Sequence, residues 1–99
     1  MRLAAAATVV LVAAGCGGGA PSSSGIDGKT LFVQQCGACH TLADAGTNGS
    51  FGADLERSRP RRAAILKAIA EGKGTMPAAI VGGRDADLVA AYVARAVRR

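Results

Sequence analysis

The chain has 99 residues, a formal net charge of +5 and 49% hydrophobic residues, but it has only two Phe, one Tyr and no Trp. This length allows one small domain and excludes a multidomain enzyme. Much of the apolar content is Ala or lies near the N-terminus, so the few large side chains need a disulfide, a metal, a cofactor or a partner to complete a stable core.

The first 15 residues are predicted to be a bacterial export signal. Met1-Arg2 supplies a positive start, and residues 3–14 form an apolar run that is too short to span a membrane. The run ends in Ala13-Ala14-Gly15-Cys16, which resembles the lipobox of bacterial lipoproteins. We therefore expect Cys16 to be lipidated; ordinary cleavage nearby, with Cys16 lost or left as a free thiol, is the alternative.

Residues 16–25 are predicted to form a flexible tether, because Gly and Ser dominate them and no apolar periodicity is present. A lipid on Cys16 would hold the following domain at the extracytoplasmic face of the membrane, where disulfides are permitted. The chain is therefore divided into a signal peptide (1–15), a lipidated tether (16–25) and a single domain (26–99).

Three helices are predicted in the domain. Asp27 is the expected N-cap of a helix from about Gly28 to Gln35. Residues 41–54 are rich in Gly and are predicted to be a loop. A second helix is predicted to open at Ser58-Arg59-Pro60 and to close at Gly72.

Residues 74–83 are predicted to form a second loop, which carries Met76-Pro77. Asp85 is the expected cap of a C-terminal helix, in which apolar residues recur from Leu88 to Val97 at i, i+3 and i+4 spacing. The sequence shows no period-2 alternation and no hairpin signal. The predicted fold class is therefore all-α.

The motif that carries chemistry is Cys36-Gly37-Ala38-Cys39-His40. Cys-x-x-Cys-His is the attachment signature of c-type haem (heme c). Two thiols three residues apart on a helical turn can reach the two vinyl groups of one porphyrin edge, and the adjacent His can ligate the iron. The motif predicts one covalently attached haem per chain.

Three other sites are weighed against haem. A zinc site needs four ligands, but the chain has one His and its remaining Cys lies on the predicted tether. A thioredoxin-like redox pair would follow a strand, and no strand is predicted before Cys36. A Cys36–Cys39 disulfide is possible outside the cell, but it leaves His40 unexplained.

The residues around the motif resemble the class I c-type cytochromes. The pattern is Gly28-x-x-x-Phe32-x-x-x-Cys36-x-x-Cys39-His40, followed in the family order by Met76-Pro77 and by a C-terminal helix with Val89-x-x-Tyr92. The resemblance covers residues 26–99 and implies three main helices wrapped around one haem. It also implies that the terminal helices cross, with Gly28 and Phe32 against Val89 and Tyr92.

The same resemblance implies a sixth iron ligand and its surroundings. Met76 is the only Met beyond the signal and takes the ligand position, so His40 and Met76 would fill both axial sites and favour a comparatively high reduction potential. Ala53 stands where the family usually has Pro, whose carbonyl accepts a hydrogen bond from the ligating His. Leu55 is expected to pack near the porphyrin ring.

With both axial positions filled, an electron carrier is expected rather than an enzyme. The resemblance suggests a quinol-oxidising complex as donor and a terminal oxidase as acceptor. The alternatives are an electron-accepting subunit dedicated to one extracytoplasmic dehydrogenase or reductase, and a haem sensor or enzyme with an open iron position. A monomer is expected.

Two basic clusters lie outside the motif. The run Arg57, Arg59, Arg61 and Arg62 is interpreted mainly as a solvated helix start, with pairing to haem propionates or to an acidic docking surface as the other reading. Arg95, Arg98 and Arg99 suit the C-terminal end of a helix dipole. Neither cluster is interleaved with aromatic residues, so nucleic-acid binding is not expected.

Overall fold

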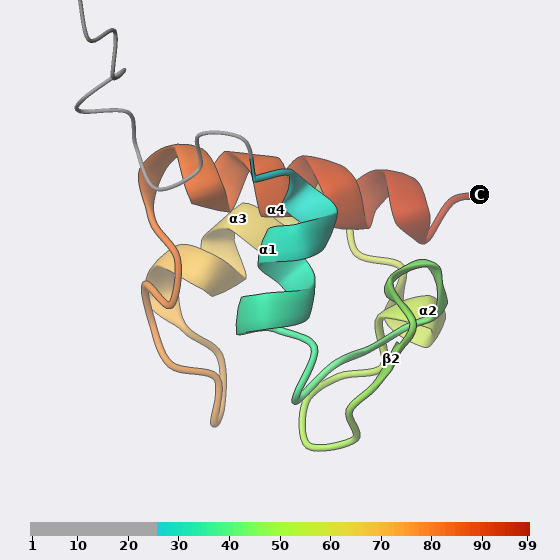
Figure 1. Ribbon diagram of the computed structural model, residues 1–99. Helices are drawn as coiled ribbons and strands as arrows, with labels where there is room; N and C mark the ends of the chain where they lie inside the picture. The colour runs from blue at the N-terminus through green and yellow to red at the C-terminus, as the bar shows by residue number, and fades with distance from the viewer. Residues whose placement is uncertain (1–25) are drawn as a thin grey trace, which may run out of the picture.

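The computed structural model describes residues 26–99. The predicted signal peptide, the tether and the lipidation of Cys16 lie outside the described residues and stay predictions. Within the described part, the domain consists of four α-helices and a two-stranded hairpin, with the last helix, α4, lying across α1 and α3 (Figure 1). None of these helices is long and apolar enough to cross a membrane.

Helix α1 (Gly28–Gln35) has the bounds that the sequence predicts. The side chain of Asp27 accepts a hydrogen bond of 2.8 Å from the backbone N–H of Thr30 and so caps the first turn. Leu31 and Phe32 are buried on the inner side of the helix. The helix ends at Cys36, which places the Cys-x-x-Cys-His motif directly after its last turn.

The segment predicted as one loop, residues 41–54, contains a short antiparallel hairpin, so that prediction is wrong in part. Strands β1 (Thr41–Leu42) and β2 (Thr47–Asn48) flank a 3-10 turn, η1 (Ala43–Ala45), which ends at Gly46 in a left-handed conformation. Strands of two residues are too short to show alternation. The hydroxyl of Thr47 supports the hairpin by donating to the carbonyl of His40 at 2.8 Å.

The helix predicted to open at Ser58-Arg59-Pro60 begins later, at Arg62, and a short helix that was not predicted precedes it. Helix α2 (Leu55–Ser58) is capped by the Asp54 side chain, and helix α3 (Arg62–Glu71) begins after a break. Pro60 lacks an N–H and disfavours helical geometry in the residue before it, so Arg59 leaves the helix with a φ of 45°. The end of α3 at Gly72 agrees with the prediction.

Helix α4 (Gly83–Ala96) begins two residues before the predicted cap at Asp85, with Gly82 as its N-cap. Asp85 lies in its first turn, where a negative charge favours the helix dipole. The inner face of α4 buries a continuous row of side chains that forms much of the core: Val89, Ala90, Tyr92, Val93 and Ala96.

The crossing of α1 over α4 depends on a glycine. A Cβ atom built on Gly28 would meet the backbone carbonyl of Leu88 and would lie 2.7 Å from the Cβ of Tyr92. Next to this contact the rings of Phe32 and Tyr92 pack at a centroid distance of 6.2 Å. The close backbone approach therefore admits no side chain at position 28.

We expect Gly28→Ala to destabilise the haem-loaded protein by about 2 kcal/mol, because overpacking against a backbone atom outweighs the better helix propensity of Ala. Urea unfolding followed by circular dichroism measures the effect. Gly82→Ala is the matched control, since nothing lies within 4 Å of a Cβ at that position, and we expect it to cost about 0.5 kcal/mol as a weaker N-cap. Equal losses in the two variants would contradict the close-packing explanation.

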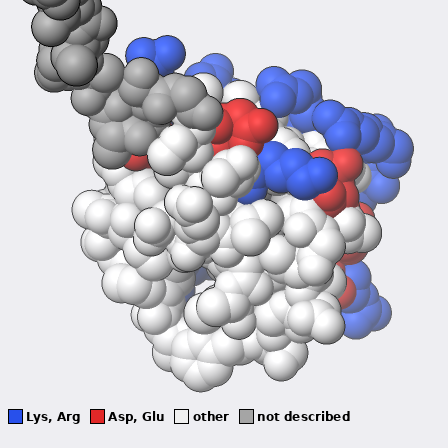
Figure 2. Space-filling model, in the orientation of Figure 1, with Lys and Arg blue, Asp and Glu red and all other residues white. Residues whose placement is uncertain are grey.

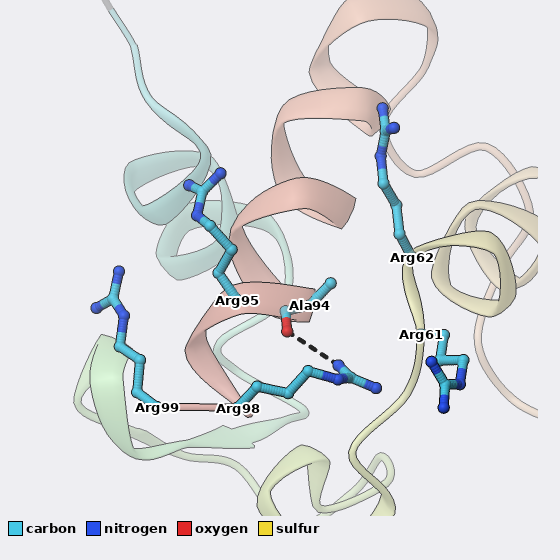
Figure 3. A pocket seen from close by; sticks show the side chains of 6 residues that line it. All are labelled: Arg61, Arg62, Ala94, Arg95, Arg98 and Arg99. Atoms are coloured by element: carbon cyan, nitrogen blue, oxygen red, sulfur yellow. Dashed lines mark hydrogen bonds between the residues drawn. The ribbon is translucent and has the colours of Figure 1, made fainter.

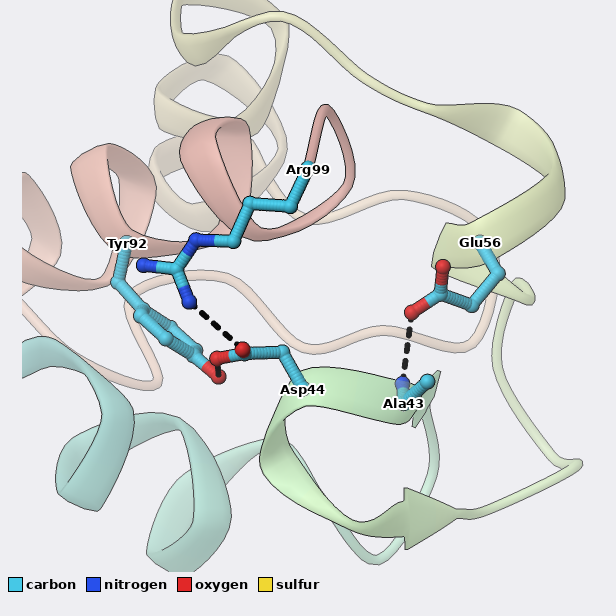
Figure 4. A network of polar contacts seen from close by, with 5 residues as sticks. All are labelled: Ala43, Asp44, Glu56, Tyr92 and Arg99. Atoms are coloured by element: carbon cyan, nitrogen blue, oxygen red, sulfur yellow. Dashed lines mark hydrogen bonds and ion pairs between the residues drawn. The ribbon is translucent and has the colours of Figure 1, made fainter.

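A polar network ties the end of α4 to η1 (Figure 4). The hydroxyl of buried Tyr92 donates to one carboxylate oxygen of Asp44 at 2.6 Å, and Arg99 donates to the other at 2.7 Å. The Tyr92 hydrogen bond, with Arg99 beside it, holds the pKa of Asp44 below its usual value of 3.8. Burial and the bond to Asp44 raise the pKa of Tyr92 above its usual value of 10.

The two shifts predict stability losses at opposite ends of the pH range. The ionised Asp44 carboxylate stabilises the fold above about pH 3.8, and this contribution is lost as the pH falls further. The protonated Tyr92 hydroxyl contributes fully below about pH 10, and its contribution declines as the pH rises beyond that value. We expect Tyr92→Phe to lower the Tm between these limits.

Thermal unfolding from pH 2 to pH 11 tests this prediction. The difference in Tm between the wild type and Tyr92→Phe should shrink at both extremes. Arg62→Gln is the control, because its ion pair with Asp87 is exposed and 3.6 Å long and should contribute little at any pH. A Tm difference for Tyr92→Phe that stays constant across the range would remove the Asp44 contact from the explanation.

Candidate functional site

The crevice between the helices contains a cavity of about 610 Å³. Its walls come from every helix of the described domain and from the loop that carries Met76, and Lys73 is the only Lys, Arg, Asp or Glu among the described residues that line it. Aliphatic side chains of α3 form one wall: Ile65, Ala68 and Ile69. The cavity therefore suits a large apolar body rather than a charged one.

The thiols of the motif lie at the floor of this cavity. The turn after α1 is closed by hydrogen bonds from the backbone N–H groups of Cys39 and His40 to the carbonyl of Cys36, at 3.1 and 3.0 Å. Both cysteines are free, and both line the cavity. The turn thus directs two thiols and one imidazole into the same space.

The electrostatics of Cys36 argue against a reactive redox thiol. Burial, with the neighbouring Cys39, raises the pKa of the Cys36 thiol to about 11. Redox-active Cys-x-x-Cys pairs depend on a thiol whose pKa is lowered toward neutrality. In residues 26–99 no group of three or more His, Cys, Asp or Glu side chains is arranged to hold a metal ion, so a zinc site has no ligand set there.

The imidazole of His40 is oriented by the backbone of the loop that faces it. Its Nδ1 atom lies 2.7 Å from the carbonyl oxygen of Ala53. With Nδ1–H as donor, Nε2 carries the lone pair and is the nitrogen able to ligate a metal. Ala53 thus supplies the acceptor without the proline that the family usually has, because the acceptor is a main-chain carbonyl.

Gly52 allows this approach. A Cβ atom at position 52 would lie 2.7 Å from Cε1 and 2.9 Å from Nδ1 of the His40 ring. The backbone N–H of Gly52 also donates to the carbonyl of Cys39 at 2.7 Å. The loop is therefore bonded to the motif on one side and fits closely against the imidazole on the other.

Met76 lines the cavity from the loop between α3 and α4. The loop is held by paired backbone hydrogen bonds between Lys73 and Met76, at 3.1 and 2.9 Å, and by one of 2.7 Å from Ala79 to Ile69 of α3. Gly72 fits under the turn, since a Cβ there would lie 2.7 Å from the Met76 carbonyl. The thioether is thus placed on a braced loop.

The structure brings most of the predicted site residues to this cavity. Those that line it are Phe32, Cys36, Cys39, His40, Ala53, Leu55 and Met76. Gly28 and Tyr92 do not line it; they form the crossing of α1 and α4. Sequence reasoning missed Phe51 and Ile80, which also line the cavity while 72% and 38% exposed. An aromatic residue within a Gly-rich loop was the available signal for Phe51.

Charge is distributed unevenly over the surface around the site. Figure 2 shows Lys and Arg side chains mainly along the top and the right-hand side of this face, while its lower left part is almost free of charged side chains. Among the described residues, Lys73 is the one charged side chain in the lining of the crevice. Most of the positive charge of the described domain therefore lies outside the crevice.

The donor set and the cavity fit a haem. Two cysteines, a histidine whose imidazole is oriented by a main-chain carbonyl and a methionine line one largely apolar space. Thiols suit covalent attachment, and imidazole with thioether is an axial pair for iron. Neither a zinc site nor a thiol redox pair would use the large apolar volume.

Comparison with known proteins also indicates a haem-binding domain. Residues 24–93 match the family model described as Cytochrome C oxidase, cbb3-type, subunit III. The structure is similar to the crystal structure of the c-type cytochrome SorU from Sinorhizobium meliloti, with 35% sequence identity, a TM-score of 0.67, and coverage of 71% of this chain and 86% of that chain. Among curated proteins no match was found.

Proposed function

Because this chain belongs to the c-type cytochrome family described as cytochrome c oxidase, cbb3-type, subunit III, with covalently bound haem c as its cofactor, we propose that it is a membrane-tethered carrier of single electrons. The observation that carries the proposal is the convergence of Cys36, Cys39, His40 and Met76 on one apolar cavity. Bound haem supplies a one-electron couple between ferric and ferrous iron.

The residues of the chain make this couple usable for transfer. Cys36 and Cys39 would hold the group by thioether bonds, and His40, oriented by the Ala53 carbonyl, would ligate its iron together with Met76. The aliphatic wall of α3 would help to exclude water from the bound group. A dry, braced site changes little between two charge states, which favours electron transfer over substrate chemistry.

The proposed setting is the extracytoplasmic face of a membrane. The lipobox-like sequence ending at Cys16 supports a lipid anchor, and the Gly/Ser-rich residues 16–25 support a tether. A tether confines the domain near membrane partners and raises their effective concentration. A quinol-oxidising complex as donor and a terminal oxidase as acceptor are the partners that we propose.

Spectroscopy of protein made in a host with the c-type maturation machinery tests the carrier function. We expect covalent haem on a denaturing gel, reversible one-electron reduction, and ferrous protein that binds carbon monoxide slowly or incompletely because both axial positions are filled. Rapid and complete carbon monoxide binding to the native protein would instead indicate an open iron site and a sensor or enzyme.

A second candidate is a dedicated subunit of a larger redox enzyme. The matching family model, which is named for a subunit of an oxidase, favours it. The domain would carry the same electrons but within one complex. Purification of the tagged chain under mild detergent conditions discriminates: a stoichiometric catalytic subunit supports this candidate, and an isolated monohaem protein supports the free carrier.

A further inference from the structure

The described domain has a second cavity that shares no lining residue with the crevice. It has a volume of about 500 Å³ and lies between the start of α3 and the last turns of α4 (Figure 3). We call it the arginine groove, because its lining consists of Ala94 and five arginines: Arg61, Arg62, Arg95, Arg98 and Arg99. Two arginines of the first basic cluster in the sequence and all three of the second therefore lie around the same groove.

The positive charge of the groove is only partly balanced. Arg99 pairs with Asp44 at 2.7 Å, and Arg62 pairs with Asp87 at a longer 3.6 Å. Within residues 26–99, no carboxylate pairs with the other three arginines of the groove. This shallow, open depression is therefore surrounded by an excess of positive charge, which an anionic partner would relieve.

One of these arginines is already fixed in place. Arg98 donates to the carbonyls of Pro60 and Ala94, both at 2.9 Å, and to the carbonyl of Arg59 at 3.0 Å. It reaches from the end of α4 toward the segment that carries Arg61, and its bond to Ala94 is drawn in Figure 3. These bonds use three of the five guanidinium N–H groups and leave two for another acceptor.

An ordered guanidinium differs from a solvated surface charge. A free arginine loses rotamer freedom when it binds, whereas Arg98 has lost this freedom before any partner arrives. The planar fork of a fixed arginine matches the two oxygens of a carboxylate. The groove is therefore preorganised for carboxylates, which favours the second reading of the arginine run, that of an acidic docking surface.

We propose that the arginine groove docks an acidic segment of a protein redox partner, one with projecting Asp or Glu side chains. The partner class rests on the proposed electron-carrier function. A protein fits better than a bilayer, because Arg98 is held back against main-chain carbonyls and cannot extend to a flat layer of head groups, whereas a projecting carboxylate can enter the groove.

The position of the groove suits this role. Pro60 lines the crevice and its neighbour Arg61 lines the groove, so the same short segment borders both cavities. A partner held by its carboxylates in the groove would sit beside the crevice without covering it with charge. Electrostatic docking and apolar contact at the crevice would then use different surfaces.

Binding of a labelled hexaglutamate peptide to the haem-loaded, full-length mature protein tests the proposal by fluorescence anisotropy at low salt. Arg61→Gln removes one unpaired charge without removing any bond found within the described residues, and Arg98→Lys keeps the charge but loses the fork. We expect each to weaken binding roughly tenfold. Arg84→Gln, exposed and outside the groove, is the charge-matched control and should change affinity less than about twofold.

The possible outcomes separate this proposal from its rivals and from the carrier function. Equal weakening by Arg61→Gln and Arg84→Gln would show a general charge effect and overturn the groove. Arginine-dependent binding to phosphatidylglycerol vesicles without peptide binding would overturn the protein partner in favour of a membrane surface. Arg61→Gln carries the test if Arg98→Lys fails to fold. Reversible haem reduction, measured on the same samples, reports the carrier function independently of every binding result.

Discussion

Without haem, the chain should lack a stable tertiary fold, and it should gain one when haem is attached. The crevice of about 610 Å³ is lined by large apolar side chains such as Phe51, Leu55 and Ile65, and each of them that faces water instead of the porphyrin forfeits up to about 1.5–3 kcal/mol of burial. The whole free energy of unfolding of a domain is only about 5–15 kcal/mol. An empty crevice therefore cannot persist, and the helices around it are expected to collapse or separate.

The test compares one sequence in two states. The wild-type chain made with and without the c-type maturation machinery is examined by far-ultraviolet circular dichroism and urea unfolding, under reducing conditions. Only the haem-loaded form should unfold in a cooperative transition. Cys36→Ala/Cys39→Ala, made with the machinery present, should behave like the haem-free chain. A cooperative transition in the haem-free wild type would show that the helices are stable by themselves.

Replacement of Met76 should produce the largest change in redox chemistry. Met76→His exchanges a thioether for an imidazole, which stabilises ferric iron, and we expect the reduction potential to fall by on the order of 100 mV or more. Met76→Ala leaves the sixth position without a protein ligand, so ferrous protein should bind carbon monoxide rapidly.

Ile80→Ala is the matched control for Met76, since Ile80 lines the same cavity from the same loop but has no ligand atom. Its potential should stay close to that of the wild type. Spectroelectrochemical titration and carbon monoxide binding measure all three variants. An unchanged potential and an unchanged spectrum in both Met76 variants would remove Met76 from the set of ligands.

The parts of the fold that could be predicted from the sequence are those that depend on neighbours in the chain. The bounds of α1 follow from Asp27, which caps the helix through a residue three positions away, and from the motif that begins at Cys36. The end of α3 follows from Gly72, which takes a positive φ of 75°. Each signal acts within one turn of the residue that it controls.

The errors arise where one residue type serves two purposes. Pro60 suits the first turn of a helix, but here it lies in the non-helical segment between α2 and α3. The hairpin at residues 41–48 depends on the Thr47 hydroxyl, which accepts from the backbone N–H of Leu42 at 3.1 Å. A side chain that completes a backbone bonding pattern leaves no periodicity to detect.

The candidate site likewise has parts that the sequence predicts and parts that it does not. The thiols and the imidazole are contiguous in sequence, so their common role could be predicted. The contact between Tyr92 and Asp44 joins residues 48 positions apart, and the arginine groove joins the start of α3 to the end of α4. Neither juxtaposition has a local signal, and both exist only because α4 lies across the rest of the domain.

The bond between His40 and Ala53 has a consequence for redesign of the iron site. Because the acceptor belongs to the main chain, no exchange of the side chain at position 53 can delete it. A change of the side chain at position 53 would therefore act on the stiffness of the loop and leave the acceptor in place. Position 52 is the sensitive one, because a methyl group on Gly52 would lie 2.7 Å from the ring and would have to displace either the imidazole or the loop that holds its acceptor.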